Sequence, residues 1–194
     1  MGIFKNKEFV LLIVGALISL VSTLIGFFAQ TYFTYLLSNK GKVIIYIKSV
    51  YSKSTKMAWG FSATSDGILF NVPLWIELHN TKSTKQIIRN VNLSLYSCNK
   101  YVCTMKQATH YSTKEEKEYF GDNGSNSFLL DGGEIKRFDL YFAISQKEFN
   151  SDFDEVRISY FDSKDKYHEF KIFEISEPWI ISKNKTDDDW RAIN

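Results

Sequence analysis

The sequence predicts a mainly β protein in which one N-terminal transmembrane α-helix precedes an antiparallel β-sandwich, with a small β-barrel as the alternative. Two observations carry this prediction. Residues 9–39 form 31 consecutive positions without a charged side chain, and roughly 20 apolar residues suffice to cross a bilayer as a helix. Downstream, apolar and polar residues alternate with the period of two that is typical of half-buried strands.

The uncharged segment fits a membrane span better than a signal peptide. A cut after Ala29 would need a small residue at position 27, where Phe27 stands. Aromatic side chains, which favour the headgroup level, gather at the end of the segment: Phe27, Phe28, Tyr32, Phe33 and Tyr35. We therefore expect a short polar N-terminus (1–8), a transmembrane helix with an interfacial extension (9–39), a β-sandwich domain (40–176) and a C-terminal tail (177–194). The lipid bilayer is the expected partner of residues 9–39.

One stripe of the predicted helix is small and polar. Small residues let two helix backbones approach closely, and hydroxyl or amide groups can bond across the contact. The candidates for helix–helix packing recur at spacings of three and four: Gly15, Ser19, Ser22, Thr23, Gly26 and Gln30. In the alternative interpretation, the hydroxyl groups bond back to their own helix and the stripe has no partner.

The charges that flank the span favour a cytoplasmic domain in a single-pass membrane protein. Lys5, Lys7 and Glu8 precede the span, whereas five lysines follow it before the first acidic residue: Lys40, Lys42, Lys48, Lys53 and Lys56. By the positive-inside rule the lysine-rich side stays in the cytoplasm. An extracytoplasmic domain remains the alternative, because large domains cross membranes largely regardless of charge.

The two cysteines leave the compartment open. Cys98 and Cys103 flank a four-residue link inside a predicted hairpin. If they face each other at the base of the loop, a disulfide is possible, and an oxidising compartment would follow. The alternative is a pair of reduced cysteines that serve only in packing.

Alternation and turn residues predict eight strands in the domain. Turns are indicated at 80–82, 123–125, 131–133 and 162–165 by Asn, Asp, Gly and Ser. Short strands with regular turns are typical of an immunoglobulin-like sandwich, with a small barrel second. The expected strands are Lys42–Val50, Ile68–His79, Gln86–Ser97, Tyr101–Thr109, Ser127–Leu130, Glu134–Ile144, Glu155–Phe161 and Tyr167–Ile175.

A fold-level resemblance agrees with this prediction. The chain places an apolar span and a lysine-rich exit before passages such as VPLWIELHNTKSTKQIIRNVNLSLY and FLLDGGEIKRFDLYFAI. It resembles the many uncharacterised bacterial single-span proteins whose C-terminal part is an immunoglobulin-like sandwich. In those proteins an Asn followed by I-x-x-V-x-L joins two strands, as do Asn80, Ile88, Val91 and Leu93 here. The resemblance implies a fold and no activity.

The sequence offers no catalytic or metal-binding motif. His79, His110 and His168 lack partners at metal-ligand spacing, and we expect His79 on a sheet face and His168 in a solvated turn. Asp122-Asn123-Gly124 and Asp131-Gly132-Gly133 fit turns better than calcium loops, and Asp187-Asp188-Asp189 is expected to be solvated. We therefore expect no enzyme, no metal and no cofactor. The net charge of +2 argues against a nucleic-acid partner.

Large aromatic residues form the candidate interaction surface. Trp75, Tyr96, Tyr141 and Phe161 alternate with the predicted core positions, and such residues are favoured at the centres of interfaces. In the alternative interpretation they are covered by a loop, by the other sheet or by the tail, which is expected to dock through Trp179 or Trp190. A one-residue error in register would reverse every such assignment.

Three functions are compatible with these features. The first is a membrane-anchored, non-catalytic binding module with a protein partner or self-association. The second is a membrane-acting effector, similar in architecture to anti-phage proteins, in which the β-domain senses a signal and the helices oligomerise. The third is a structural or secretion component of the cell envelope.

Overall fold

The computed structural model describes residues 6–51, 58–65, 67–111, 117–120, 127–148, 151–181 and 184–193. The chain divides into two compact units, Met1–Lys40 and Gly41–Asn194, which are considered separately. Of the predicted features, Asp122-Asn123-Gly124 and the side chain of His110 lie outside the described residues.

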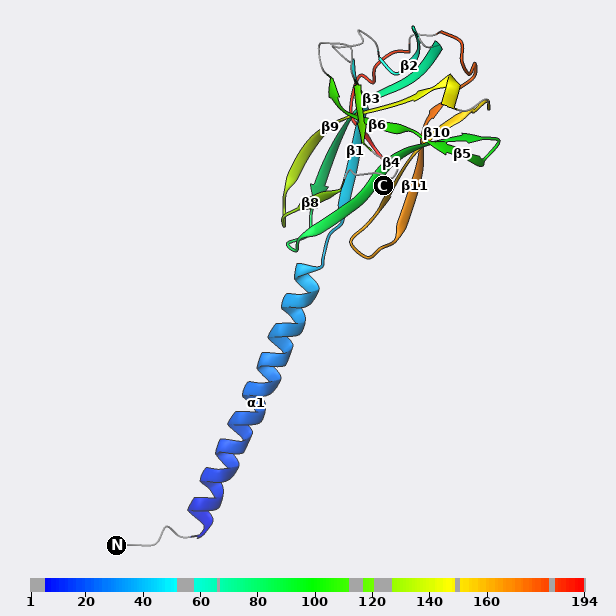
Figure 1. Cartoon of the computed structure of the whole chain (residues 1–194). Helices are drawn as coiled ribbons and strands as arrows, with labels where there is room; N and C mark the ends of the chain where they lie inside the picture. Colours follow the sequence, from blue (N-terminus) through cyan, green and yellow to red (C-terminus); the bar gives the residue numbers. More distant parts are fainter. Residues whose placement is uncertain are drawn as a thin grey trace. The chain divides into compact units, whose positions relative to one another are not determined.

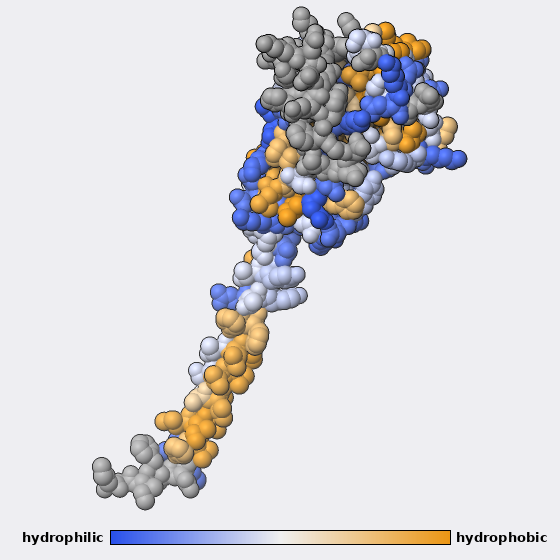
Figure 2. All heavy atoms as spheres, in the orientation of Figure 1, coloured by the Kyte–Doolittle hydropathy of each residue, from blue (hydrophilic) through white to orange (hydrophobic). Residues whose placement is uncertain are grey.

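The first unit is a single helix, α1 (Asn6–Ser38). It is long and apolar enough to span a membrane, and its surface is hydrophobic over most of its length (Figure 2). The 33 residues correspond to about 50 Å at 1.5 Å per residue, whereas a bilayer core is about 30 Å thick. The helix is therefore long enough to extend beyond a bilayer core into the headgroup region.

The second unit contains two antiparallel sheets (Figure 1). The larger sheet has the order β12-β1-β3-β9-β6-β7, and β2 pairs with the first half of β3. Neighbouring strands run antiparallel throughout. Its strands are β1 (Val43–Ser49), β2 (Gly60–Thr64), β3 (Gly67–Asn80), β6 (Lys106–Tyr111), β7 (Lys117–Phe120), β9 (Ile135–Ser145) and β12 (Arg191–Ala192).

The smaller sheet has the order β11-β10-β4-β5, and β8 pairs with the first residues of β4. A short 3-10 helix, η1 (Gln146–Glu148), follows β9. The five strands are β4 (Gln86–Ser97), β5 (Lys100–Thr104), β8 (Phe128–Leu130), β10 (Glu155–Phe161) and β11 (Tyr167–Glu174).

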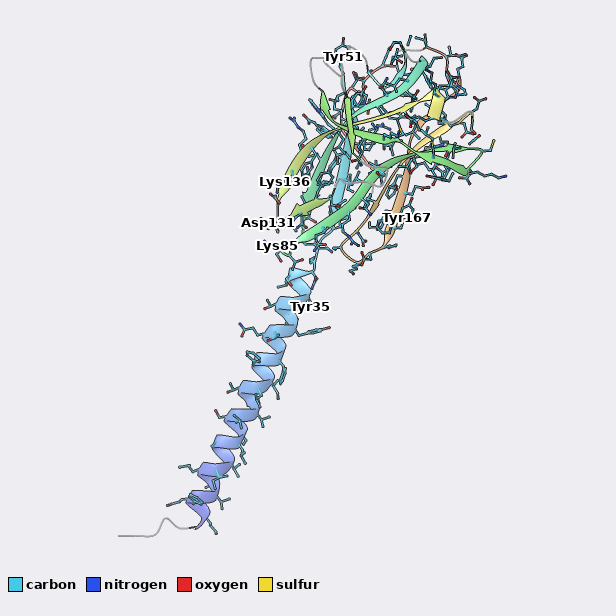
Figure 3. All side chains as sticks on the ribbon, viewed as in Figure 1. Tyr35, Tyr51, Lys85, Asp131, Lys136 and Tyr167 are labelled. Atoms are coloured by element: carbon cyan, nitrogen blue, oxygen red, sulfur yellow. The ribbon has the colours of Figure 1, made fainter. Side chains whose placement is uncertain are left out.

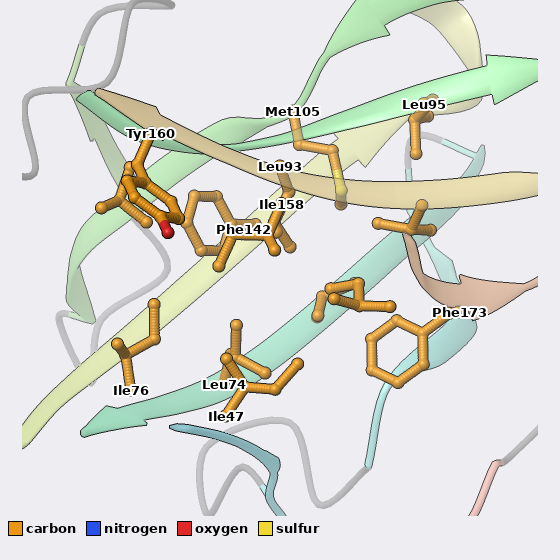
Figure 4. Close-up of a cluster of buried hydrophobic side chains, with 14 of the residues drawn as sticks. Ile47, Leu74, Ile76, Leu93, Leu95, Met105, Phe142, Ile158, Tyr160 and Phe173 are labelled. Atoms are coloured by element: carbon orange, nitrogen blue, oxygen red, sulfur yellow. The ribbon is translucent and has the colours of Figure 1, made fainter. Parts of the chain in front are cut away.

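The core lies where the inward faces of the two sheets meet (Figure 4). The predicted alternation is correct on both sides of it: Leu74 and Ile76 of β3 are buried, and so are Leu93 of β4 and Ile158 of β10. The two sheets do not close into a barrel. A helix followed by a mainly β, two-sheet domain is therefore confirmed, and the barrel alternative is wrong.

The predicted strand Tyr101–Thr109 is wrong, because it is two strands in different sheets. The break falls at Met105, which is 1% exposed and donates its backbone N–H to Leu93 at 2.8 Å. Beyond it, buried Gln107 of β6 donates to the carbonyl of Val91 in β4 at 3.0 Å. The chain thus crosses from one sheet to the other without a turn sequence, and alternation alone cannot reveal such a crossing.

The C-terminal segment packs against the domain, as the predicted docking requires. Trp179 is 9% exposed and belongs to the core, where its ring meets Phe61 and Phe153 edge-on. Trp190 stacks on Trp75 with ring centroids 6.3 Å apart. Asp187 is not simply solvated, because its carboxylate accepts the backbone N–H of Ser49 at 2.8 Å.

The turns at one end of the sandwich are held together by a buried amide. Asn80, which is 2% exposed, donates to the carbonyls of Thr84 at 2.9 Å and Asp131 at 2.7 Å. Lys85 pairs with Asp131 at 3.0 Å across the same two turns (Figure 3). A Cβ at Gly132 would lie 2.1 Å from the backbone oxygen of Ser83, so only glycine fits this close approach.

Candidate functional site

A groove of about 400 Å³ lies on the outer face of the smaller sheet. Four strands contribute to it: β4, β5, β10 and β11. Two of its residues, Tyr96 and Phe161, were predicted as interaction residues. The lining contains aromatic rings, amides and hydroxyl groups and no charged side chain: Asn90, Asn92, Ser94, Tyr96, Tyr101, Thr104, Ser159, Phe161 and Tyr167.

The pairing of the strands brings the polar residues of the groove together. Asn92 is opposite Ser159 in the pairing of β4 with β10, and Ser94 is opposite Thr104 in the pairing of β4 with β5. Ser94 and Ser159 are both 6% exposed, so they form the floor. Asn90 has a φ of 53°, a conformation that Asn tolerates better than most residues.

Hydrogen bonds fix the polar side chains of the groove. The hydroxyl groups of Ser94 and Thr104 are 3.2 Å apart, and the Tyr101 hydroxyl is 3.1 Å from that of Thr104. Asn92 accepts from the Gln107 amide at 3.1 Å. A ligand would therefore meet groups that are already ordered, which lowers the entropy cost of binding.

A charged cluster borders the groove at Arg157. Its guanidinium donates to Glu155 at 2.8 Å and to Glu169 at 2.9 Å, and it lies 4.0 Å from the centre of the Tyr96 ring. The hydroxyl of Tyr96 donates to Glu169 at 2.5 Å, and that of Tyr167 does so at 2.8 Å. Arg157 therefore bridges the two carboxylates and contacts the face of the Tyr96 ring.

The cluster keeps Glu169 ionised. Burial alone would raise the pKa of Glu169, but hydrogen bonds from Tyr96, Arg157 and Tyr167 lower it below its usual value. Burial and the bond to Glu169 raise the pKa of the Tyr96 phenol. A carboxylate held ionised between an arginine and two phenols is poorly suited to act as a general acid.

The structure does not bring the four predicted interaction residues together. Tyr96 and Phe161 lie on the outer face of the smaller sheet, whereas Trp75 and Tyr141 lie on the larger one. Tyr141 is 8% exposed and donates to the side-chain oxygen of buried Asn71 at 2.6 Å. The ring of Trp75 is contacted by Trp190 and, at 4.5 Å, by Arg137.

The predicted packing stripe of α1 is exposed along its whole length. Thr23 donates its hydroxyl to the carbonyl of Ser19 at 2.8 Å, as the alternative interpretation expects. No described atom outside the helix backbone and adjacent residues lies within 4 Å of a Cβ added at Gly15 or Gly26. Ser22 and Gln30 are exposed on the same helix.

The two cysteines carry free thiols. Cys98 and Asn99 form a two-residue turn with φ values of 47° and 66°, and Cys103 is opposite Leu95. The cysteines therefore do not face each other at the base of the hairpin. Burial and the charge of Glu148 raise the pKa of Cys103 to about 11.

His79 and His168 occupy structural positions. His79 lies on the outer face of β3, 2.5 Å from Glu77, as the prediction of a sheet-face residue expects. His168 is not a solvated turn residue: it is half-buried, pairs with Asp162 at 2.9 Å and stacks on Tyr160. Among the residues that the structure describes, no group of three or more His, Cys, Asp or Glu side chains could hold a metal ion.

Sequence reasoning missed most of the groove. Asn92 and Ser94 alternate with the predicted core positions of β4, but small polar residues on an outward face give no signal of their own. Tyr101 is the second residue of β5 and Tyr167 is the first of β11, so both lie beside turns, and their side chains are 59% and 50% exposed. Tyrosines placed directly beside predicted turns were the one sequence signal that could have located the groove.

No protein-family model matches this chain, and a search of curated proteins gives no match either.

Proposed function

We propose that this chain is a membrane-anchored, non-catalytic module that binds a protein partner through the groove on its smaller sheet. The composition of the groove carries the proposal. Tyrosine supplies large, rigid contact area, whereas Ser and Asn supply adaptable hydrogen bonds, and the same combination dominates antibody binding loops. Charged residues are depleted at interface centres, and the lining of this groove has none.

The anchor is part of the proposal. Helix α1 is long and apolar enough to span a membrane, and lysines at 40, 42 and 48 follow it. The positive-inside rule favours a cytoplasmic domain. A binding domain anchored in the bilayer would bind its partner at the membrane surface.

Photocrosslinking in living cells tests the binding face. Benzoylphenylalanine replaces Tyr101 or Tyr167 in the full chain, and it replaces Tyr51 or Ile135 in the matched controls. Both controls are exposed, by 55% and 62%, and neither lines the groove. We expect the same discrete adduct from both groove positions and none from the controls. An adduct common to all four positions, or none from the groove, contradicts the proposal.

A membrane-acting effector is the second candidate, and the open space beside Gly15 and Gly26 favours it. It requires the α1 helices of several copies to associate. Measuring membrane potential after induced expression separates the two functions: a binding module leaves the potential unchanged, and an effector collapses it. Variants Gly15→Leu and Gly26→Leu would prevent that collapse, because leucine keeps the backbones apart.

The third candidate, an envelope component, has weaker support. It requires an extracytoplasmic domain, for which a Cys98–Cys103 bond was the expected indication. Both thiols are free.

A further inference from the structure

A second pocket, of about 260 Å³, opens at the end of the sandwich where β1 begins. Both sheets contribute to it. Its walls come from the start of β1, from the link between β3 and β4, and from the turn between β10 and β11. The polar side chains that matter for its chemistry are Lys42, Lys82, Gln86, Asp162, Ser163, Lys164 and His168.

The pocket carries an excess of positive charge. Lys42, Lys82 and Lys164 line it, and among the described residues none of the three forms an ion pair. Asp162 supplies the one carboxylate of the lining. That carboxylate is occupied by His168 at 2.9 Å and by the backbone N–H groups of Lys164 and Lys166. The three ammonium groups therefore have no anionic partner within the part of the chain that the structure describes.

Gln86 fixes the polar wall of the pocket. It is 8% exposed, and its side-chain oxygen accepts from the hydroxyl of Ser163 at 2.7 Å and from the ammonium of Lys82 at 3.3 Å. An ammonium group has three donors, so Lys82 keeps two for a ligand. The remaining wall is apolar, with Val43, Ile88 and Tyr160. An inorganic anion would not use that wall, but the glycerol carbons of a lipid would.

The chain connects this pocket closely to α1. Gly41 lines the pocket and comes three residues after Ser38, the last residue of the helix. Three residues of chain reach about 11 Å at most. If α1 spans a bilayer, anionic headgroups are therefore within reach of Lys42. Lysines close to an anionic leaflet are attracted to it.

We propose that this pocket binds the phosphate of an anionic lipid headgroup, with Lys42, Lys82 and Lys164 contacting the phosphate oxygens. A volume of about 260 Å³ lies just below the 300–1,000 Å³ range of drug-sized pockets, so it suits a headgroup rather than a whole lipid. The inference rests on the proposed membrane anchor and not on the groove of the smaller sheet. Bound lipid would hold the domain at the membrane surface.

Native mass spectrometry of the full chain in detergent micelles tests the site. Phosphatidylglycerol and phosphatidylcholine are offered separately at equal concentration, and calorimetry with inorganic phosphate forms a third arm. The test variant is Lys42→Gln/Lys82→Gln/Lys164→Gln. The control variant is Lys100→Gln/Lys147→Gln/Lys185→Gln, which removes the same charge at residues that do not line the pocket. Lys42→Glu alone serves if the triple variant does not fold, because the hydrogen bonds between Lys42 and Thr81 use the backbone of Lys42.

We expect the wild-type chain and the control variant to retain phosphatidylglycerol at least tenfold better than phosphatidylcholine. The test variant and Lys42→Glu should lose at least tenfold of that retention. Equal retention of both lipids, or an equal loss in the control variant, overturns the proposal. Inorganic phosphate that binds to the wild type while phosphatidylglycerol does not would identify a soluble phosphate compound as the ligand and overturn the lipid source.

Discussion

The side chain of Glu169 links the groove on the smaller sheet to the charged cluster that borders it. Its carboxylate accepts from Tyr96, Tyr167 and Arg157 at 2.5, 2.8 and 2.9 Å. These bonds join β4, β10 and β11 on the outer face of the smaller sheet. The bonds favour the ionised form, so the stability that Glu169 confers depends on pH.

We predict that the domain loses stability in acid. Because the pKa of Glu169 is lower in the folded than in the unfolded chain, the folded state binds fewer protons. The stabilisation is complete above the unfolded pKa of about 4.3 and disappears as the pH falls through the lower, folded value. Thermal unfolding of the full chain in detergent between pH 8 and pH 3 should show a falling Tm below about pH 4. Glu169→Gln and Tyr96→Phe should flatten that fall; an unchanged profile in both would count against this assignment.

The two cysteines should differ in reactivity. Cys98 is exposed, whereas Cys103 is half-buried and has a pKa raised to about 11 by burial and Glu148. Since the thiolate is the reacting form, we predict that a maleimide at pH 8 labels Cys103→Ser at least tenfold faster than Cys98→Ser. Equal labelling rates of these two single-cysteine variants would contradict the difference in burial.

The sequence could predict only part of the candidate site, because alternation assigns each side chain to one face of a sheet and nothing more. Tyr96 and Phe161 were found because alternation assigns faces, and both are outward. Tyr141 is outward too, yet it is 8% exposed and belongs to a small cluster with Leu69 and Ala143 on the far face of the larger sheet. Alternation reports a face and says nothing about what covers it.

At the scale of elements, β4 was predictable from its strict alternation, whereas two of the short strands, β2 and β12, were not. The predicted range Gln86–Ser97 coincides with β4, because buried Val91, Leu93 and Leu95 mark its inner face. Gly60–Thr64 and Arg191–Ala192 are too short to show a period. β2 pairs with the residues of β3 that follow it, with Thr64 opposite Gly67, whereas β12 pairs with β1 from the other end of the domain sequence, and no local pattern encodes that second pairing.

The C-terminal segment is an element of the fold, and its two tryptophans should contribute unequally. Trp179 packs in the core against Phe61 and Phe153, whereas Trp190 is half-buried on the outer face. We predict that Trp179→Ala costs about 3–5 kcal/mol, the usual cost of removing a buried aromatic ring. Trp190→Ala should cost about 1 kcal/mol. Urea unfolding of the full chain in detergent measures both; equal costs would mean that the segment does not pack as described.

At the scale of the whole molecule, an apolar helix precedes a two-sheet domain after only a few residues of chain. The tether between Ser38 and Val43, the first residue of β1, comprises four residues. A linker of this length limits how far the domain can move from the end of the helix. The pocket that Gly41 and Lys42 line therefore stays within a few residues of chain from the end of α1.

The side of the membrane is measurable through Cys98. We predict that a membrane-impermeant maleimide labels Cys98 of the full chain only after the cells are lysed, because the lysines that follow α1 favour the cytoplasmic side. A cytosolic protein with an exposed cysteine provides the lysis control. Labelling of intact cells would place the domain outside and would favour the envelope candidate.

The pairing of β12 with β1 has a mechanical consequence. The strands are antiparallel, with Ala192 opposite Tyr46 and Arg191 opposite Ile47, so Ile193 lies at the end of the pair that the helix enters. A load applied between α1 and Ile193 pulls on the adjacent ends of β1 and β12. The hydrogen bonds between these two strands then break one after another. Tension from a partner would thus detach β12 from β1 before it unfolded the core. The rest of the sandwich would stay folded at that load.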